Sequence, residues 1–369
     1  MHLRQPITAG MSGFLIRSIA LLCMVAAGTA HPTIMPKEEV PAYFPVGLTN
    51  PSGSIGCVRT LTGGVEALDL ASGRRLWKSD APSRALLVGS HEVFLLEERG
   101  GRLQAAAYEP RGGRRIKTWP CNAGLPAWAS LAEPGGGRRR TTFQVRARRS
   151  GNVLEIGYDA QELVATGIAP SAAQSQAKGI LRLDLNTGSV EHLPGENFRA
   201  LPFVEPAPSR GYQPVRFHAR AAGPELMLGG PPPDVQGALV AGDLRVVFER
   251  AANGRSVRVR RWRASTGAED PSIEIAGVID AIWPTLDRDH VAMRRASQQS
   301  MCDLYSLVGG VRIAILERPI DIAVIAGRIF WTTPSGRDQI NLIATEAVTG
   351  RILWRRTVWR DTPAGEPIP

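Results

Sequence analysis

Short segments in which apolar and polar residues alternate run through most of the chain after residue 50. The pattern is clearest in residues 65–78 (VEALDLASGRRLWK) and 343–355 (IATEAVTGRILWR). In both, an alternating segment leads to a Ser-Gly or Thr-Gly pair, and a second segment follows that contains Trp. Alternation with a period of two is typical of a half-buried strand, and glycine supplies the positive φ of a tight turn. Each segment is therefore predicted to be a β-hairpin.

Weaker copies of this unit lie at residues 107–116, 181–190, 259–267 and 304–313. The six copies place these turn glycines in equivalent positions: Gly73, Gly113, Gly188, Gly267, Gly310 and Gly350. Three of the five intervals are about forty residues long and two are nearly double that. A repeat of about forty residues corresponds to four short antiparallel strands, which is one blade of a β-propeller. We therefore predict an all-β chain with a single propeller of seven or eight blades, in which each wide interval holds a degenerate blade or a long insertion.

The pattern Leu-Asp-Leu, [Ser/Thr]-Gly and Trp resembles the repeat of the PQQ-like (quinoprotein) β-propeller family. Residues 65–78 and 343–355 match it well, residues 181–190 match its first half, and the other copies match mainly in the turn. The resemblance covers about residues 50–360 and implies the propeller fold, whereas one fold can host many functions. In such a ring the N-terminal strand, near residues 44–60, is expected beside the blade that ends at Trp359. Trp77 and Trp354 are interpreted as residues that pack between blades.

The family resemblance does not extend to the residues that carry catalysis. Its dehydrogenases hold PQQ with an adjacent cysteine pair, a tryptophan floor, a calcium site and a catalytic aspartate. This chain has no adjacent cysteine pair, and no region of it matches the calcium or catalytic positions. We therefore expect no catalytic residue, no metal site and no cofactor, with PQQ and calcium as the alternative.

The first thirty residues have the features of a signal peptide. Arg4 and Arg17 precede or flank an apolar run at residues 19–27, and a small-residue triplet ends at Ala30. Translation could begin at Met1 or Met11. The remaining organisation is predicted as a Pro-rich leader (31–50), the propeller (51–360) and a tail (361–369). We expect an exported monomer, periplasmic or secreted, without a membrane-spanning segment.

The net charge bears on the class of binding partner, and the cysteine content bears on disulfide bonds. The chain carries 44 Lys and Arg against 34 Asp and Glu, a formal net charge of +10. A basic protein suggests anionic partners. The arginines are nevertheless spread over every predicted blade, as at Arg258, Arg260 and Arg263, which favours a solvated outer face and makes nucleic acid an unlikely partner. After loss of the signal peptide, Cys57, Cys121 and Cys302 remain, as a disulfide with one thiol left over or as separate buried thiols.

Candidate chemistry is sparse. The densest polar cluster, residues 287–290, could bind a cation but is better explained as a charged turn, and an N-terminal His31 could chelate copper only with a second histidine nearby. Three irregular segments, 120–142, 160–178 and 205–236, are candidates for binding loops. The sequence thus predicts a non-enzymatic propeller that binds an unknown protein or polymer at its rim. The alternative is a divergent quinoprotein oxidoreductase or another propeller enzyme with its site at the channel mouth.

Overall fold

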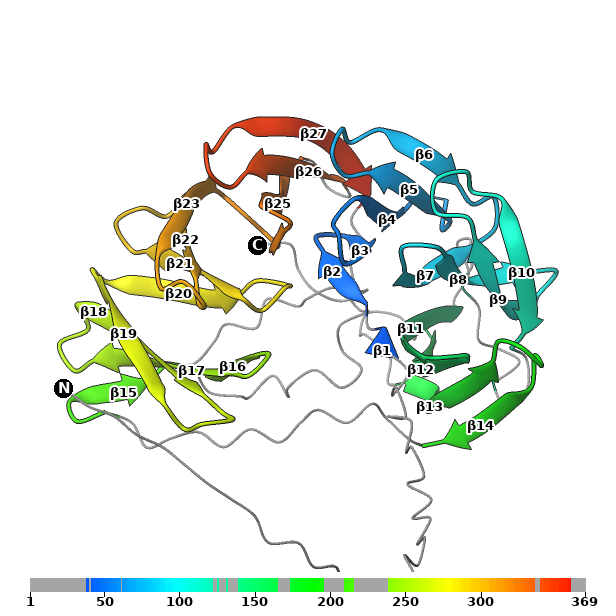
Figure 1. The fold of residues 1–369 in the computed structure, drawn as a ribbon, viewed down its shortest axis with the longest axis horizontal. Helices are drawn as coiled ribbons and strands as arrows, with labels where there is room; N and C mark the ends of the chain where they lie inside the picture. Colours follow the sequence, from blue (N-terminus) through cyan, green and yellow to red (C-terminus); the bar gives the residue numbers. More distant parts are fainter. Residues whose placement is uncertain are drawn as a thin grey trace, which may run out of the picture. The chain divides into compact units, whose positions relative to one another are not determined.

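Antiparallel strands form all the regular structure in the part of the chain that the computed structural model describes. That part comprises residues 38–39, 41–60, 62–121, 125, 131, 139–164, 173–195, 209–215, 238–335 and 339–359. It belongs to one structural unit, Lys37–Pro369. Its strands form six sheets (Figure 1). Over these residues, no helix has the length and apolar character needed to cross a membrane.

Each sheet is built around four strands that follow one another along the chain. The first sheet contains β2 (Ala42–Phe44), β3 (Gly47–Thr49), β4 (Ile55–Arg59), β5 (Val65–Asp69) and β6 (Arg75–Lys78). The second contains β7 (Ser83–Val88), β8 (Val93–Arg99), β9 (Arg102–Tyr108) and β10 (Arg115–Pro120). The third contains β1 (Glu38–Glu39), β11 (Arg139–Ser150), β12 (Val153–Val164), β13 (Ala173–Asp184) and β14 (Val190–Pro194).

The second half of the chain repeats this arrangement. The fourth sheet contains β15 (Tyr212–Pro214), β16 (Ala238–Ala241), β17 (Leu244–Ala251), β18 (Ser256–Arg263) and β19 (Glu269–Ala276). The fifth contains β20 (Ile279–Pro284), β21 (His290–Arg295), β22 (Met301–Ser306) and β23 (Arg312–Glu317). The sixth contains β24 (Ile322–Ile325), β25 (Arg328–Pro334), β26 (Gln339–Glu346) and β27 (Ile352–Trp359).

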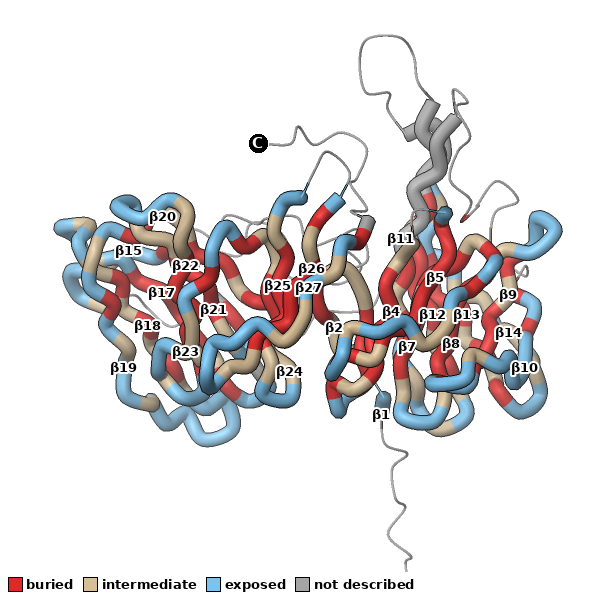
Figure 2. The backbone as a smooth tube through the Cα atoms, turned by 90° about the horizontal axis from the view of Figure 1, so that it is seen from above, coloured by how far each residue is buried: buried red, intermediate tan, exposed pale blue. Residues whose placement is uncertain are grey.

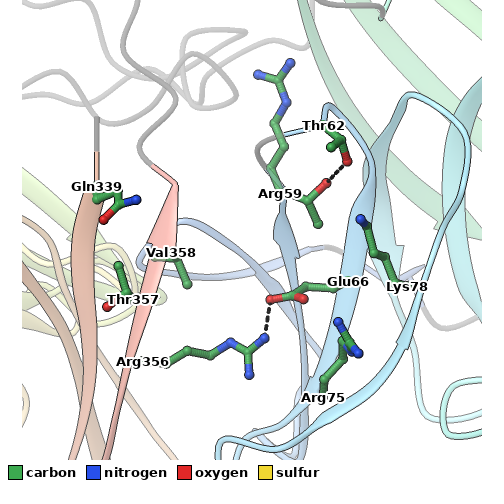
Figure 3. A pocket seen from close by; sticks show the side chains of 10 residues that line it. Arg59, Thr62, Glu66, Arg75, Lys78, Gln339, Arg356, Thr357 and Val358 are labelled. Atoms are coloured by element: carbon green, nitrogen blue, oxygen red, sulfur yellow. Dashed lines mark hydrogen bonds and ion pairs between the residues drawn. The ribbon is translucent and has the colours of Figure 1, made fainter. Parts of the chain in front are cut away.

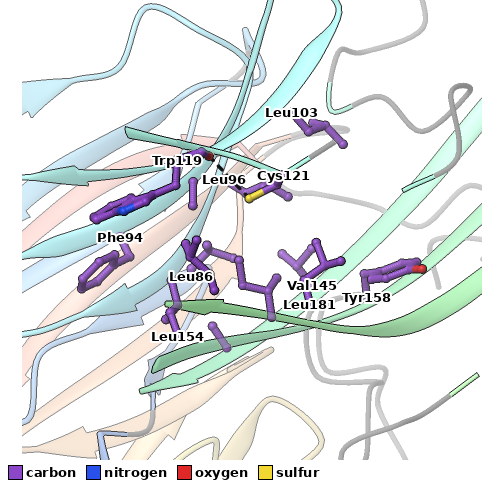
Figure 4. Close-up of a cluster of buried hydrophobic side chains, with 14 of the residues drawn as sticks. Leu86, Phe94, Leu96, Leu103, Trp119, Cys121, Val145, Leu154, Tyr158 and Leu181 are labelled. Carbon is purple, nitrogen blue, oxygen red and sulfur yellow. Dashed lines mark hydrogen bonds between the residues drawn. The ribbon is translucent and has the colours of Figure 1, made fainter. Parts of the chain in front are cut away.

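Neighbouring sheets pack face to face through buried apolar side chains. Five clusters join the first sheet to the second, the second to the third, the fourth to the fifth, the fifth to the sixth, and the sixth back to the first. Figure 4 shows the cluster between the second and third sheets, where Phe94 and Trp119 lie near Leu154. Buried residues follow the strands, and exposed residues gather in the turns (Figure 2). Consecutive four-stranded meanders that pack in this way form a β-propeller, which confirms the predicted fold class. The described residues form six blades, fewer than the seven or eight that were predicted.

The six repeat glycines occupy the same place in the six sheets, namely the turn between the last two strands of the meander. Their φ angles lie between 66° and 78°. Each glycine N–H donates to the carbonyl four residues earlier, at 2.7–3.0 Å. A residue with a Cβ would be strained at these positions, so glycine is favoured there. For that reason the turns could be located from the sequence.

The two wide intervals differ from each other. Between Gly113 and Gly188, the described residues form β10 of the second sheet and β11, β12 and β13 of the third, and no additional blade. The last three strands have twelve residues each. Much of the segment 160–178, expected as a loop, therefore lies in the β12–β13 hairpin. Between Gly188 and Gly267, residues 196–208 and 216–237 lie outside the described part of the chain, as do most of the other two candidate loops. No described cluster joins the third sheet to the fourth.

The expected Pro-rich leader also differs from the prediction, because residues 42–49 form β2 and β3 of the first sheet. Phe44 is only 1% exposed and packs edge-on against Phe330 of the sixth sheet. Burial of this ring thus fixes as strand a segment whose prolines suggest an irregular leader. The first sheet lies beside the sixth, as expected from ring closure, but each of these sheets takes its strands from one end of the chain only.

Four side chains fasten neighbouring sheets at the repeat turns, and we call each of these contacts a latch. In every latch a side chain of one sheet covers the turn glycine of the next sheet and donates to the carbonyl three residues before that glycine. Indole N–H groups form three of them: Trp354 to Leu70 at 3.0 Å, Trp77 to Pro110 at 2.8 Å and Trp119 to Leu185 at 3.2 Å. Arg261 forms the fourth, from Nη1 to Leu307 O at 2.8 Å. The structure thus places Trp77 and Trp354 between sheets.

Candidate functional site

The boundary between the first and last sheets carries the candidate site. On β27, alternate residues face the first sheet: Trp354 latches onto Gly73, Arg356 follows, and Val358 is buried. This order follows from the two-residue period of a strand. On the first sheet, β5 runs toward Gly73 and β6 returns from it, so Glu66 and Lys78 lie at the end of the strands away from the latch.

Arg356 links the two sheets above the latch. Its Nη2 donates to Glu66 Oε1 at 2.7 Å, and its Nη1 donates to Gly73 O at 3.3 Å. The side chain of Glu66 is only 11% exposed, so this ion pair is partly shielded from water and neutralises the carboxylate. Arg356 Nε is buried and has no hydrogen-bond partner among the described residues. Residues from opposite ends of the sequence are therefore held together by a charge-assisted hydrogen bond.

Beyond this ion pair the sheets leave a cleft of about 480 Å³, which we call the closure cleft (Figure 3). Its volume falls within the range of about 300–1,000 Å³ that is usual for ligand sites. Ten residues line it, most of them cationic or hydroxyl-bearing: Arg59, Thr60, Thr62, Glu66, Arg75, Lys78, Gln339, Arg356, Thr357 and Val358. Four of these side chains are cations and one is a carboxylate, so the lining has an excess of positive charge.

Strand register explains why Arg75 and Lys78 line the same cleft although they are three residues apart. Lys78 pairs with Glu66 and Trp77 with Ala67, but Arg75 pairs with Leu68 because of a one-residue irregularity between them. This bulge returns Arg75 to the face of the sheet that carries Glu66. Arg75 and Lys78 are exposed, and neither forms an ion pair with a described residue.

Many arginines elsewhere in the described part form ion pairs with carboxylates of their own sheet. Glu97, which is fully buried, is bonded by Arg99 and Arg115 as well as by the Tyr108 hydroxyl. Glu155 lies between Arg148 and Arg182. Burial pushes the pKa of Glu155 upward, but its hydrogen bonds to these arginines outweigh burial and hold the pKa below its usual range. Arg75 and Lys78 have no such partner among the described residues, and they share this with other exposed arginines such as Arg74 and Arg102.

The three strand arginines that suggested a solvated outer face are not equally solvated. Arg258 lies 4.1 Å above the centroid of the Tyr212 ring, a cation–π contact. Arg260 bonds both Glu249 and Glu269, with only 19% of its side chain exposed. Arg263 is 44% exposed and pairs loosely with Asp270. The prediction missed these contacts because the partners come from neighbouring strands.

The polar cluster at residues 287–290 forms the turn between β20 and β21. His290 Nδ1 lies 2.6 Å from Asp287 Oδ2, and Asp287 Oδ1 accepts from Val324 N at 2.9 Å. Asp287 therefore connects this turn to the sixth sheet. Within the described residues, no group of three or more His, Cys, Asp or Glu side chains could hold a metal ion. The expected His31 site lies outside the described residues.

Two further arginines approach each other from different sheets. Arg146 lies on β11 and Arg288 in the β20–β21 turn, where it adopts a left-handed backbone with φ 62°. Burial lowers the pKa of both, and the nearby Tyr43 opposes the shift. The mutual repulsion of the two guanidinium groups further lowers the pKa of Arg146. Two sheets thus bring positive charge together near a tyrosine of a third sheet, an arrangement that the sequence pattern did not reveal.

The three remaining cysteines are free and buried. Burial raises the pKa of Cys57 to about 12 and that of Cys121 to about 11. Thiols with such pKa values are poor nucleophiles near neutral pH. Of the two possibilities left open by the sequence, the structure has the separate thiols.

Comparison with known proteins adds likeness in fold only. No protein-family model matches the sequence, and no curated protein matches it. Solved structures with some likeness include the computationally designed Ika8 protein, with 11% identity over 87% of this chain and 88% of that one and a TM-score of 0.32. BamB from Moraxella catarrhalis shows 12% identity over 89% and 80%, with a TM-score of 0.21. The dihydro-heme d1 dehydrogenase NirN in complex with DHE shows 11% over 87% and 66%, with a TM-score of 0.31.

Proposed function

We propose that this protein is an exported, non-enzymatic β-propeller scaffold that holds a partner protein at the rim carrying the closure cleft. The observation that carries this proposal is the lining of the cleft. Cations, hydroxyls and an amide suit it to polar recognition, and its one carboxylate is already bonded to Arg356. The ten lining residues include no histidine, the most common general base, and no cysteine, an intrinsically strong nucleophile.

A rigid support for the cleft favours binding over chemistry as its role. The Trp354 latch and the Arg356–Glu66 ion pair fix the two walls relative to each other before any partner arrives. A preformed site loses less conformational freedom on binding than a flexible one. Export is proposed from the signal-like residues 1–30, and N-terminal sequencing of the mature protein is expected to begin at His31.

Site-specific photo-cross-linking tests the scaffold role. A photoreactive amino acid at Thr62, in the lining, is expected to capture one defined partner from the exported protein fraction of the source cells. The matched control places the same amino acid at Thr349, an exposed position in the repeat turn at the other end of the sixth sheet. Capture of the same protein at both positions, or at neither, would overturn the proposal.

A further inference from the structure

We propose that the closure cleft binds an extended acidic peptide segment, whose carboxylates are held by Arg75 and Lys78. This inference rests on the proposed function and names the chemistry of the partner. Three features of the cleft support it: its uncommitted charge, the absence of aromatic side chains in its lining, and the carboxylate that it already holds.

The uncommitted charge lies on one strand. Arg75 and Lys78 both belong to β6, and the bulge before Trp77 places them on the face that looks toward β27. Arg356 is neutralised by Glu66, so a ligand meets Arg75 and Lys78 as an excess of positive charge rather than as members of an internal network. Two cations on one side of a cleft attract an anionic chain and fix its position by hydrogen bonds.

The other side chains of the lining do not favour a ligand that binds by stacking its rings. Its ten residues contain no aromatic side chain, and Val358 is the one aliphatic side chain among them. Single-stranded nucleic acids gain much of their affinity by stacking bases on aromatic rings, which this cleft does not offer. Thr62, Thr357 and Gln339 instead provide hydroxyl and amide groups, which can hydrogen-bond to the main chain of an extended peptide.

The carboxylate already in the cleft indicates which anion fits. Arg356 donates to Glu66 at 2.7 Å, so this wall accommodates a carboxylate bonded to a guanidinium group. Phosphate sites often use the backbone N–H groups at a helix N-terminus, and the described part of the chain contains no helix. The carboxylate bonded to Arg356 and the lack of a helix N-terminus in the described part together favour an acidic peptide over a phosphate-bearing ligand.

Fluorescence anisotropy with a fluorescein-labelled hexaglutamate peptide and the purified full chain tests the inference. We expect saturable binding at low salt that weakens as salt is added. In the double variant Arg75→Gln/Lys78→Gln, affinity should fall by about tenfold or more, since two charged contacts are lost. The matched control, Arg351→Gln/Arg355→Gln, removes two exposed arginines of the sixth sheet outside the cleft and should change affinity by less than about twofold.

Competing probes separate the alternatives. A labelled hexalysine peptide should not bind, and tripolyphosphate should displace hexaglutamate only weakly. Displacement by tripolyphosphate at lower concentration than by unlabelled hexaglutamate would overturn the peptide assignment, as would equal losses in the two double variants. If hexaglutamate fails to bind while Thr62 still cross-links its partner, the acidic-peptide inference fails and the scaffold proposal stands. Failure of the cross-link as well removes both.

Discussion

The sixth sheet meets its two neighbours in different ways. At the first sheet, Trp354 of β27 covers Gly73 and donates to Leu70 O. At the fifth sheet, the equivalent position on β23 is Ala314. Its register with Leu304 matches that of Trp354 with Ala344, and the same one-residue bulge precedes both. Among the described residues, no atom of a neighbouring sheet lies within 4 Å of the point where a Cβ of Gly350 would be, so this turn has no latch there.

Exposure of apolar side chains follows the same difference. In the β22–β23 and β26–β27 hairpins, five aliphatic residues are more than half exposed: Val308, Val311, Ile315, Val348 and Ile352. The fifth and sixth sheets follow each other directly in the chain, whereas the first and sixth come from its two ends. A latch is therefore present between the sixth and first sheets, where only non-covalent contacts close the ring. It is dispensable between the fifth and sixth sheets, which the chain itself connects.

The largest effect is expected from Trp354→Ala. The substitution removes the indole that covers Gly73 and leaves Leu70 O without its donor, which should lower the free energy of unfolding by about 3 kcal/mol. That value is at the lower end for an aromatic residue because Trp354 is only partly buried. Urea denaturation followed by fluorescence would measure it.

Trp77→Ala is the matched control, since Trp77 makes the same contact between two sheets that are consecutive in the chain. Amide exchange should speed up in β4, β5 and β26 in the Trp354 variant but not in the Trp77 variant, because only the former opens the boundary between the chain ends. Equal protection of these strands in the two variants would contradict the role of the latch in closure.

A second prediction compares the glycines beneath a latch and beneath none. Gly73 and Gly350 have φ angles of 71° and 70°, so alanine at either site should lower stability by about 1 kcal/mol through backbone strain. At Gly73 the new Cβ would also lie 2.7 Å from the Trp354 ring, which adds about 1–3 kcal/mol of overpacking. Thermal unfolding of both variants measures the difference, and equal losses would show that Trp354 moves aside freely.

A third prediction fills the unlatched position. Ala314→Trp should place an indole over Gly350, with its N–H directed at Ala347 O, the carbonyl three residues before the glycine. We expect a gain of about 1 kcal/mol in unfolding free energy from the covered apolar surface and the new hydrogen bond. Ala314→Phe separates these contributions because it supplies a ring without the donor. A loss of stability in both variants would mean that the fifth and sixth sheets are packed too closely for a latch.

Local signals explain how much of this architecture the sequence predicts. The alternation of β5 and β26 and the six turn glycines depend on neighbouring residues alone, so the hairpins and the fold class could be predicted. β2 and β3 were missed because each has three residues between prolines and is fixed by the burial of Phe44. The length of β12 and β13 was missed because residues 173–177 are small and polar.

Local sequence patterns could not predict the closure cleft, for a different reason. Its walls come from residues 59–78 and 339–358, and its charge excess depends on Arg356 pairing with Glu66 while Arg75 and Lys78 stay uncommitted. In a chain with arginines in every sheet, counting charges does not reveal which of them lack a partner. The expectation that the first and last blades adjoin was the one signal that could have led to the cleft, because the two clearest repeat copies lie on either side of it.

The smallest predicted effect concerns the turn beneath the Trp354 latch. Asp69 Oδ1 accepts from Ala71 N at 3.1 Å and from Ser72 N and Ser72 Oγ, both at 2.9 Å, while Arg111 of the next turn lies 3.6 Å from Oδ2. Burial pushes the pKa of Asp69 upward, but these hydrogen bonds and the Arg111 charge together outweigh burial and lower the pKa.

Because the folded pKa of Asp69 is lowered, the charged carboxylate stabilises the fold above the unfolded value of about 3.9, and this contribution is lost as the pH falls through the folded pKa. Asp69→Asn removes the charge at every pH. The stability difference between the protein and this variant should therefore be greatest near neutral pH and should shrink in acid, as measured by urea denaturation across that range. A difference that stays constant with pH would mean that Asp69 holds the turn by its hydrogen bonds alone. Its charge would then contribute nothing to the turn that Trp354 covers.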